Sequence, residues 1–406
     1  MNRFEFSGKL KTTLLIGIVI GVVSLIAQFF MHHDDMHNQF WGDILLNNFY
    51  FMGMALVALF ALAAFITAWA GWYVVFKRLM EAFTAFLIPG AVIMLILAIG
   101  NYFGWHHLYL WADEKFVEHD EVIHGKSAFL NKDMYLLATI VFVGIWLLYR
   151  YKLRSLSLEE DKLVKGDFSA HRKMRNWAAT FLPIAGYTSA ILIWLWVMSI
   201  EVHWYSTLYA WYTAASWFVG FLALLILTLI YLKSKGYFEY VTKEHIHDLG
   251  KYLFAFSIFW AYLFFDQYML IWFGNVGEET AHFKLQQTEY PVLFFTILIL
   301  NFAIPFLVLM VNTAKKTYWI LILVSVLTFI GHWFDMWLNI KPYLREVTSE
   351  ITGHHVHGAA FPGLAEIGVM IGFLSLFLFV TFKCLSKASL LPENDPYLEE
   401  SLHHHV

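Results

Sequence analysis

The chain has 406 residues, of which 60% are hydrophobic and only 14% carry a full charge, and its mean hydropathy is +0.60. A soluble domain is nearer half apolar and a quarter charged, so this composition excludes a large soluble domain and favours a membrane protein. The net charge of −4 excludes a strongly basic nucleic-acid-binding surface. The single cysteine, Cys384, excludes a disulfide framework, a cysteine-ligated iron–sulfur cluster and covalently attached haem.

Apolar runs of about 20 residues, the length that crosses ~30 Å of hydrocarbon, recur along the whole chain. The basic residues Arg3, Lys9 and Lys11 precede the first run without a small-residue cleavage site, so this run is predicted to be an uncleaved span. The runs predict an all-α integral membrane protein with one polytopic domain over residues 1–389 and a cytoplasmic tail over residues 390–406. The ten predicted transmembrane helices lie near residues 12–31, 48–76, 82–104, 133–150, 177–199, 208–232, 251–273, 290–313, 318–338 and 361–382.

The distribution of basic residues orients these spans. With both termini in the cytoplasm, 21 of the 27 Lys and Arg residues fall in inner segments. The remaining six fall in outer segments: Lys115, Lys126, Lys132, Lys284, Lys341 and Arg345. This asymmetry follows the positive-inside rule and predicts cytoplasmic termini.

Histidines are concentrated on the predicted outer side, where twelve of the 19 lie in loops or at span ends. They include His32, His33, His37, His106, His107, His354, His355 and His357. One interpretation is a metal-binding or proton-collecting surface. The favoured one is a polar rim that faces partner subunits, because no cluster has metal-ligand spacing with a supporting second shell. The run His403–His405 is interpreted as a solvated tail.

Three ionisable residues from three spans are predicted to share one depth. Asp266 lies ~22 Å and His332 ~21 Å from the inner ends of their helices at 1.5 Å per residue, which leaves each ~8–9 Å below the outer face of a ~30 Å core. Glu366 enters its span from the outside and reaches ~8 Å. Ionisable groups inside a membrane are costly and mark function by default, so we expect these three to meet in one buried layer.

Further polar residues flank this expected layer. Asp335 and Asn339 follow His332 at i+3 and i+7, which places them on one helix face. Asn301 lies mid-span, four residues before Pro305, which should kink the helix. The candidate site residues are Asp266, His332, Asp335, Glu366, Gln267 and Asn301, with Glu201 and His203 at the outer mouth. Sparser polar residues lie below them: Thr188, Ser189, Ser257, Ser325 and Thr328.

A histidine beside a carboxylate can accept and release protons near neutral pH. Such a site suits a transmembrane proton path or contact with a quinol head group. The alternative is that these residues pair with one another and only hold the helices together. A dihaem cytochrome b, which needs about four histidines inside spans, is excluded, because His332 alone is clearly inside. A secondary transporter would have broken helices at matching positions of two halves, and the prolines show that pattern only weakly.

Several segments resemble one family. They are MSIEVHWYSTLY (Met198–Tyr209), FFDQYMLIWFGNVGEET (Phe264–Thr280), GHWFDMWLNIKP (Gly331–Pro342), PGLAEIG (Pro362–Gly368) and LLPENDPYLEESLHHH (Leu390–His405). These segments are similar to the ActF subunits of bacterial alternative complex III, a quinol:cytochrome c oxidoreductase, within the NrfD/PsrC-type membrane proteins. The likeness runs from the fifth span to the C-terminus. Relatives often have a small polar residue where Asp266 stands and Ile-Pro where Val276-Gly277 stands.

The resemblance implies two four-helix bundles with two peripheral helices in the bacterial inner membrane. It implies a respiratory complex that oxidises menaquinol or ubiquinol and passes electrons to a periplasmic cytochrome c or a terminal oxidase. The implied partners are a paralogous NrfD-like subunit, an iron–sulfur subunit and haem c subunits, together with membrane lipids. Iron–sulfur clusters and haem c would be held by those partners, and no cofactor is expected to be bound by this chain itself. The chain would contribute a proton path, a quinone contact or both; a scaffold without chemistry and an independent secondary transporter are the alternatives.

Overall fold

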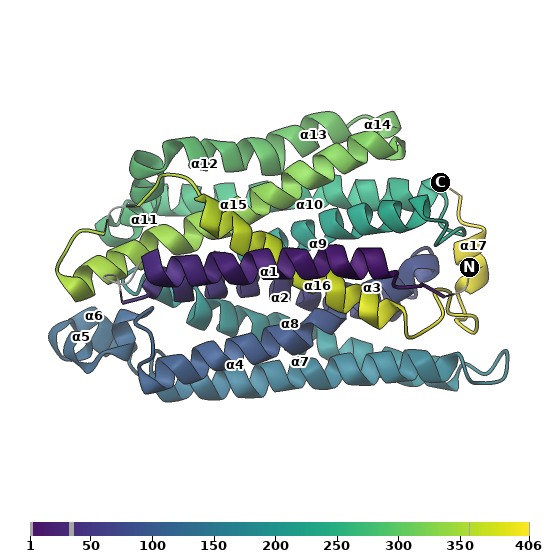
Figure 1. Ribbon diagram of the computed structural model, residues 1–406, viewed down its shortest axis with the longest axis horizontal. Coiled ribbons are helices and arrows are strands. Elements are labelled where there is room, and N and C mark those ends of the chain that lie inside the picture. The colour runs from purple at the N-terminus through teal and green to yellow at the C-terminus, as the bar shows by residue number, and fades with distance from the viewer. Residues whose placement is uncertain (1–2, 32–35, 357, 406) are drawn as a thin grey trace.

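The computed structural model describes residues 3–31, 36–356 and 358–405, and these residues form helices and connecting loops without a β-strand. Ten helical segments are long and apolar enough to cross a membrane, which agrees with the predicted number of spans. Figure 1 shows them lying alongside one another in an elongated bundle. Both termini lie at one end, here called the termini face, and α5, α6 and α11 lie at the other, here called the far face.

The helices that form the ten segments have the following bounds: α1 Gly8–Met31, α2 Asn38–Thr67, α3 Lys77–Phe83, α4 Leu87–Phe103, α7 Lys132–Glu160, α8 Ser169–Trp196, α9 Leu208–Ser234, α10 Lys243–Gly274, α12 Pro291–Leu298, α13 Ile304–Leu309, α15 Tyr318–Thr352 and α16 Leu364–Leu385. Helices α3 and α4 form one segment, and so do α12 and α13. The short helices are α5 Glu114–His119, α6 Glu121–Lys126, α11 Gly277–Glu289, α14 Asn312–Lys316 and α17 Leu398–Leu402.

Two predicted boundaries are wrong for the same physical reason. Helix α2 begins ten residues before the predicted second span, and α15 continues fourteen residues beyond the predicted ninth span. Both extensions bury polar side chains inside the protein, Asn38, Asp43 and Asn47 on α2 and Lys341 and Arg345 on α15. A hydropathy window scores these residues as polar and therefore ends the span too early. Lys341 and Arg345, which were predicted to lie in an outer segment beyond the span, accordingly lie in the continuous helix α15.

Helices α2 and α9 occupy the centre and are the most deeply buried of the ten segments. Helix α15 packs on both of them, and α10 packs on α9. The segment of α12 and α13 packs on α10 and α15, so one face of α15 is enclosed by helices on several sides. This enclosed face carries the candidate site.

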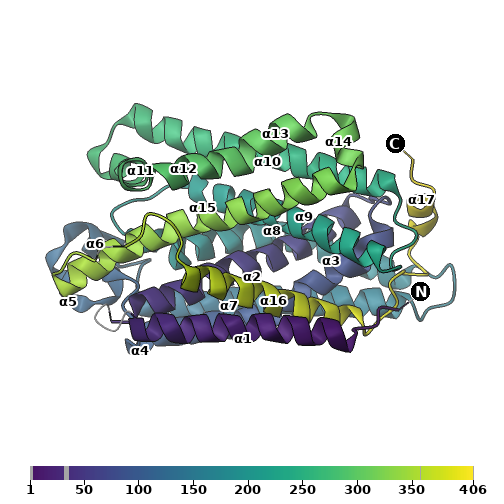
Figure 2. The same ribbon diagram turned by 45° about the horizontal axis from the view of Figure 1, so that its top comes forward.

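Helices α1 and α16 lie side by side at the edge of the bundle (Figures 1 and 2). Their backbones touch at two glycines, where a Cβ added to Gly21 would lie 2.5 Å from the Cα of Gly372. A Cβ added to Gly17 would lie 2.0 Å from the Oγ of Ser375. Close approach at small residues is a common way for membrane helices to pack, so these positions hold α1 to the rest of the protein.

The C-terminal tail is docked on the termini face. The Asn394 side chain donates to the carbonyl oxygens of Glu160 and Asp167 at 3.1 and 3.2 Å. The His404 Nε2 lies 2.6 Å from the Asp248 carboxylate, and its side chain is only 19% exposed. The prediction of a solvated histidine run is therefore wrong for His404, because a tail-to-helix contact between distant residues leaves no local sequence pattern.

Candidate functional site

One face of α15 carries a line of buried polar side chains. Its members are Ser325, Thr328, His332, Asp335 and Asn339, and all five are buried. Their spacing of three or four residues places them one above another on a single side of the helix. The line begins about 10 Å from the start of α15 and extends about 21 Å towards the far face at 1.5 Å per residue. The predicted polar face at His332, Asp335 and Asn339 is therefore present. It continues from His332 towards the termini face with the hydroxyl side chains of Thr328 and Ser325.

Asp335 lies at the centre of this line and is held by neighbouring helices. Its carboxylate accepts hydrogen bonds from four side chains: Ser216 at 3.0 Å, Asn339 at 3.2 Å, Trp260 Nε1 at 3.3 Å and the hydroxyl of Tyr212. Ser216 and Tyr212 come from α9, and Trp260 comes from α10. Donors from three helices thus stabilise negative charge at a position that is 1% exposed.

His332 is linked to Asp335 through one hydroxyl. The Ser216 Oγ lies 2.7 Å from the His332 Nδ1 and donates its single hydrogen to Asp335. Because that hydrogen is used, the network assigns the imidazole hydrogen to Nδ1, which donates to Ser216. The His332 Nε2 then carries a free lone pair. It is fully buried, has no hydrogen-bond partner among the described residues, and lies beside the perpendicular ring of Trp260.

Further buried polar atoms near this face also lack a hydrogen-bond partner within the described ranges. They are both amide atoms of Asn301 and the hydroxyls of Ser257, Ser325 and Thr328. A buried donor or acceptor left unpaired costs about 1–3 kcal/mol. Folded proteins satisfy such groups with ordered water. The part of this polar set between His332 and the termini face is therefore suited to a short file of water molecules leading to His332.

Asn301 reaches this face through a local distortion of its helix. Between α12 and α13 the chain forms a π-helical turn, Ile299–Ala303, directly before Pro305. A proline ring clashes with the carbonyl four residues earlier, here that of Asn301, and the wider turn relieves the clash. A Cβ on Gly331 would lie 2.1 Å from the Asn301 Oδ1, so Gly331 is needed for the amide to pack against α15 beside His332. The predicted kink takes the form of this π turn.

Glu366 belongs to a different cluster. The Lys341 Nζ lies 2.7 Å from the Asp43 Oδ1 and 3.1 Å from the Glu366 Oε1, and all three residues are buried. Glu366 also accepts from the backbone N–H of Gly363 at 2.7 Å and so caps the start of α16. This ion-paired triad joins α2, α15 and α16. Sequence reasoning missed Lys341, because the residue was assigned to a loop.

Asp266 stands apart from both clusters. It is half-buried on α10, and among the described residues no hydrogen bond or ion pair involves it. Its neighbour Gln267 is buried. The expected meeting of Asp266, His332 and Glu366 in one layer is therefore wrong. Depth along a helix does not fix the direction in which a side chain points.

The two residues expected at the outer mouth lie in separate pairs. The Glu201 Oε2 lies 2.6 Å from the Nδ1 of His282, which is 3% exposed. The His203 Nε2 lies 2.6 Å from Asp120, and both of these side chains reach solvent. Burial alone would raise the pKa of Asp120, but the hydrogen bond from His203 lowers it below its usual value. His282 was not singled out from the sequence, where no neighbouring residue distinguishes it from the other histidines.

The described histidines of the predicted outer side form no metal-binding group with one another, and two of them have packing roles. The His37 ring stacks on Phe29 at 3.8 Å between centroids. The His106 Nε2 donates to the Leu97 carbonyl at 2.9 Å, and burial lowers the pKa of His106 to about 4. The expectations for His32, His33 and His357 lie outside the described residues.

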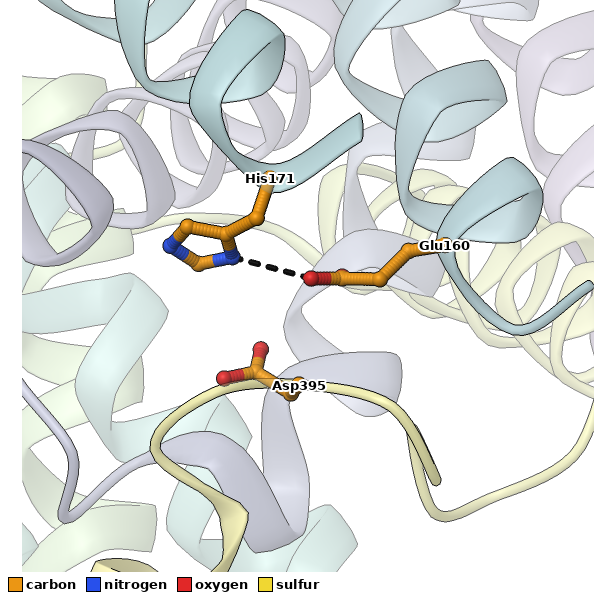
Figure 3. Close-up of side chains that lie close together, drawn as sticks. All are labelled: Glu160, His171 and Asp395. Atoms are coloured by element: carbon orange, nitrogen blue, oxygen red, sulfur yellow. Dashed lines mark hydrogen bonds and ion pairs between the residues drawn. The ribbon is translucent and has the colours of Figure 1, made fainter. Parts of the chain in front are cut away.

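One group in the described part of the chain has metal-ligand spacing, and it lies on the termini face. Glu160, His171 and Asp395 offer ligand atoms within 4.8 Å of one another, and Figure 3 shows their side chains turned towards a common space. The Lys77 Nζ lies 2.7 Å from Asp395 and 3.5 Å from Glu160. Although burial opposes ionisation of Asp395, Lys77 lowers its pKa. The ammonium thus already supplies the cation that these carboxylates require, and the group anchors the C-terminal tail.

Comparison with known proteins yields no assignment: no protein-family model matches the chain, and no curated protein matches it. The site must therefore be interpreted from its own geometry.

Proposed function

We propose that this chain conducts protons along the polar face of α15 as a membrane subunit of a respiratory quinol-oxidising complex. The observation that carries the proposal is the link from His332 through Ser216 to Asp335, with a free imidazole lone pair on one side and the Asp335 carboxylate on the other. A proton that reaches the Nε2 allows the Nδ1 proton to leave through Ser216 to Asp335. Histidine and carboxylate are the side chains best suited to such relays.

The enclosure of the site favours protons over a quinone. His332 and Asp335 are 0% and 1% exposed and are packed against Trp260 and Tyr212. A head group could reach them only by displacing these side chains, whereas a proton needs only hydrogen bonds. The enclosure of this site does not bear on a quinone contact elsewhere on the chain.

The orientation and the helix grouping are part of the same proposal. The excess of Lys and Arg on the termini face supports a cytoplasmic location for that face in the bacterial inner membrane. The pairings among α2, α4, α7 and α8, and among α9, α10, α15 and the α12–α13 segment, support two four-helix groups with α1 and α16 outside them. This arrangement agrees with the one implied by the resemblance to ActF subunits, which also supplies the expected partners, an iron–sulfur subunit, haem c subunits and a paralogous membrane subunit.

The test begins with purification in mild detergent. The proposal expects the chain to co-purify with haem and iron–sulfur subunits, and a chain that migrates alone would support an independent transporter. The complex is then placed in vesicles, and proton movement is followed during quinol oxidation. Replacing His332 by Gln or Asp335 by Asn is expected to reduce proton translocation at least tenfold. If both variants translocate protons and oxidise quinol as the unmodified complex does, the chain is a scaffold and the proposal fails.

A further inference from the structure

A buried histidine lies where the α15 line approaches the far face. His282 is on α11, and its ring is held between two aromatic rings, Trp204 at 3.9 Å and Tyr343 at 4.7 Å between centroids. The interplanar angles are 8° and 1°, so the three rings are nearly parallel. Two aromatic faces favour a cation between them, which here would be the imidazolium.

The hydrogen bonds around His282 define its resting state. The Gln286 amide nitrogen lies 3.2 Å from the His282 Nε2 and donates to the Tyr343 hydroxyl at 3.1 Å. An amide nitrogen can only donate, so the Nε2 lone pair accepts from Gln286 and the network assigns the imidazole hydrogen to the Nδ1. That hydrogen faces the Glu201 Oε2 at 2.6 Å. The imidazole therefore accepts a hydrogen bond through the Nε2 on one side and holds a proton against a carboxylate on the other.

Glu201 connects this pair to solvent. Its side chain is 18% exposed, whereas that of His282 is 4% exposed. The other titratable groups near the pair are Tyr209, Glu346 and Lys126. With Glu201 they leave an acidic surrounding, which favours the arrival of a proton.

The pair also lies next to the end of the α15 line. Asn339, the last member of the line, is followed one helical turn later by Tyr343, about 6 Å further along the axis. Two hydrogen bonds through one water span about 5.5 Å. The buried ring of Tyr209 links the two groups of residues, since it contacts both Tyr212, which donates to Asp335, and Trp204, which stacks on His282.

We propose that His282 and Glu201 form the terminal proton-transfer pair of the α15 path, an inference that rests on the proposed function. Once the Gln286 amide nitrogen turns away from the Nε2, a proton arriving from the Tyr343 side adds to that nitrogen and forms the imidazolium. The Nδ1 proton then passes to Glu201, which releases it to water at the far face. The ring and the Gln286 amide turn over to restore the resting hydrogen positions before the next proton arrives.

The experiment uses the complex in vesicles, with quinol as the driving substrate and proton release at the far face as the readout. His282→Gln and Glu201→Gln are compared with His119→Gln, which changes an exposed histidine of α5 at the same end of the protein. We expect at least tenfold slower proton release in the first two variants and an unchanged rate in the third. The pH dependence of proton release is recorded for each variant, because a purely structural role of His282 would leave that dependence unchanged.

The outcomes separate this inference from the proposed function. If Asp335→Asn loses proton translocation while His282→Gln and Glu201→Gln release protons at the normal rate and pH dependence, the terminal pair is wrong and the path itself remains. If Asp335→Asn also behaves normally, the proposed function is wrong. Should His282→Gln fail to assemble, Glu201→Gln carries the test, because its amide is nearly isosteric and the side chain is partly exposed.

Discussion

The contact between Gly331 and Asn301 offers a sharp test of the site's construction. In Gly331→Ala, the added methyl group would lie 2.1 Å from the Asn301 Oδ1 and 2.7 Å from the Leu300 Cβ, far inside ordinary contact distance. Overpacking of this kind costs about 1–3 kcal/mol. The higher helix propensity of alanine returns up to about 1 kcal/mol. We therefore expect a net loss of stability of about 1–2 kcal/mol and a displaced Asn301 amide.

A matched control lies on α7, where a Cβ on Gly144 meets nothing within 4 Å. Gly144→Ala is expected to leave stability unchanged or to raise it by up to about 1 kcal/mol, since only helix propensity changes. Thermal unfolding of the isolated complex, followed by tryptophan fluorescence, measures both variants. Each kcal/mol corresponds to roughly 1 °C in Tm for a chain of 406 residues, because the entropy of unfolding increases with chain length.

Measurements of proton translocation distinguish an effect of Gly331→Ala on packing from an effect on proton conduction. Gly331→Ala is expected to translocate protons more slowly, because Asn301 no longer faces the space beside His332. Adding Asn301→Ala should restore part of the lost Tm, the remainder being the clash with Leu300, but should not restore translocation. The reasoning is refuted if Gly331→Ala and Gly144→Ala unfold at the same temperature and translocate protons equally well.

Three further predictions concern other parts of the protein. Lys341→Met leaves the buried carboxylates of Asp43 and Glu366 without a counter-charge. We expect the free energy of unfolding to fall by about 3–5 kcal/mol, or the complex to fail to assemble, as measured by Tm and yield. Lys341→Arg should retain most of the stability. Gly372→Leu forces α16 away from α1, and protease cleavage near the N-terminus should accelerate several-fold, whereas unchanged cleavage would show that this contact does not hold α1. Burial lowers the pKa of His106 to about 4, so the unfolded chain takes up a proton near pH 6.5 that the folded protein does not. The free energy of unfolding should therefore fall by up to about 3 kcal/mol as the pH decreases from 6.5 to 4. A pH series of Tm should show this fall, and His106→Leu should remove it.

The sequence could predict features that depend on one helix at a time. The ten spans follow from hydropathy, and the shared face of His332, Asp335 and Asn339 follows from helical spacing. Ser325 and Thr328 extend that face by the same spacing. These predictions hold because both properties repeat at fixed intervals along the chain.

Features that depend on the rotation and pairing of different helices could not be predicted. Asp266 and Glu366 were placed with His332 by depth alone, whereas Glu366 pairs with Lys341 and Asp266 does not join either cluster. Ser216, which links His332 to Asp335, is one of many small polar residues, and only the packing of α9 on α15 reveals its role. A hydropathy window also scores a buried charged residue as polar and therefore leaves it out of the span.

The central claim is that Asp335 carries protons and does more than hold α15 in place. The most direct measurement is the number of protons translocated per electron in vesicles containing the complex, for the unmodified chain and for Asp335→Asn, which preserves the shape of the side chain. The account predicts that quinol oxidation continues in the variant while the protons translocated per electron, counted beyond those that quinol chemistry itself releases, fall at least tenfold. An unchanged ratio in an intact, fully assembled variant would contradict it.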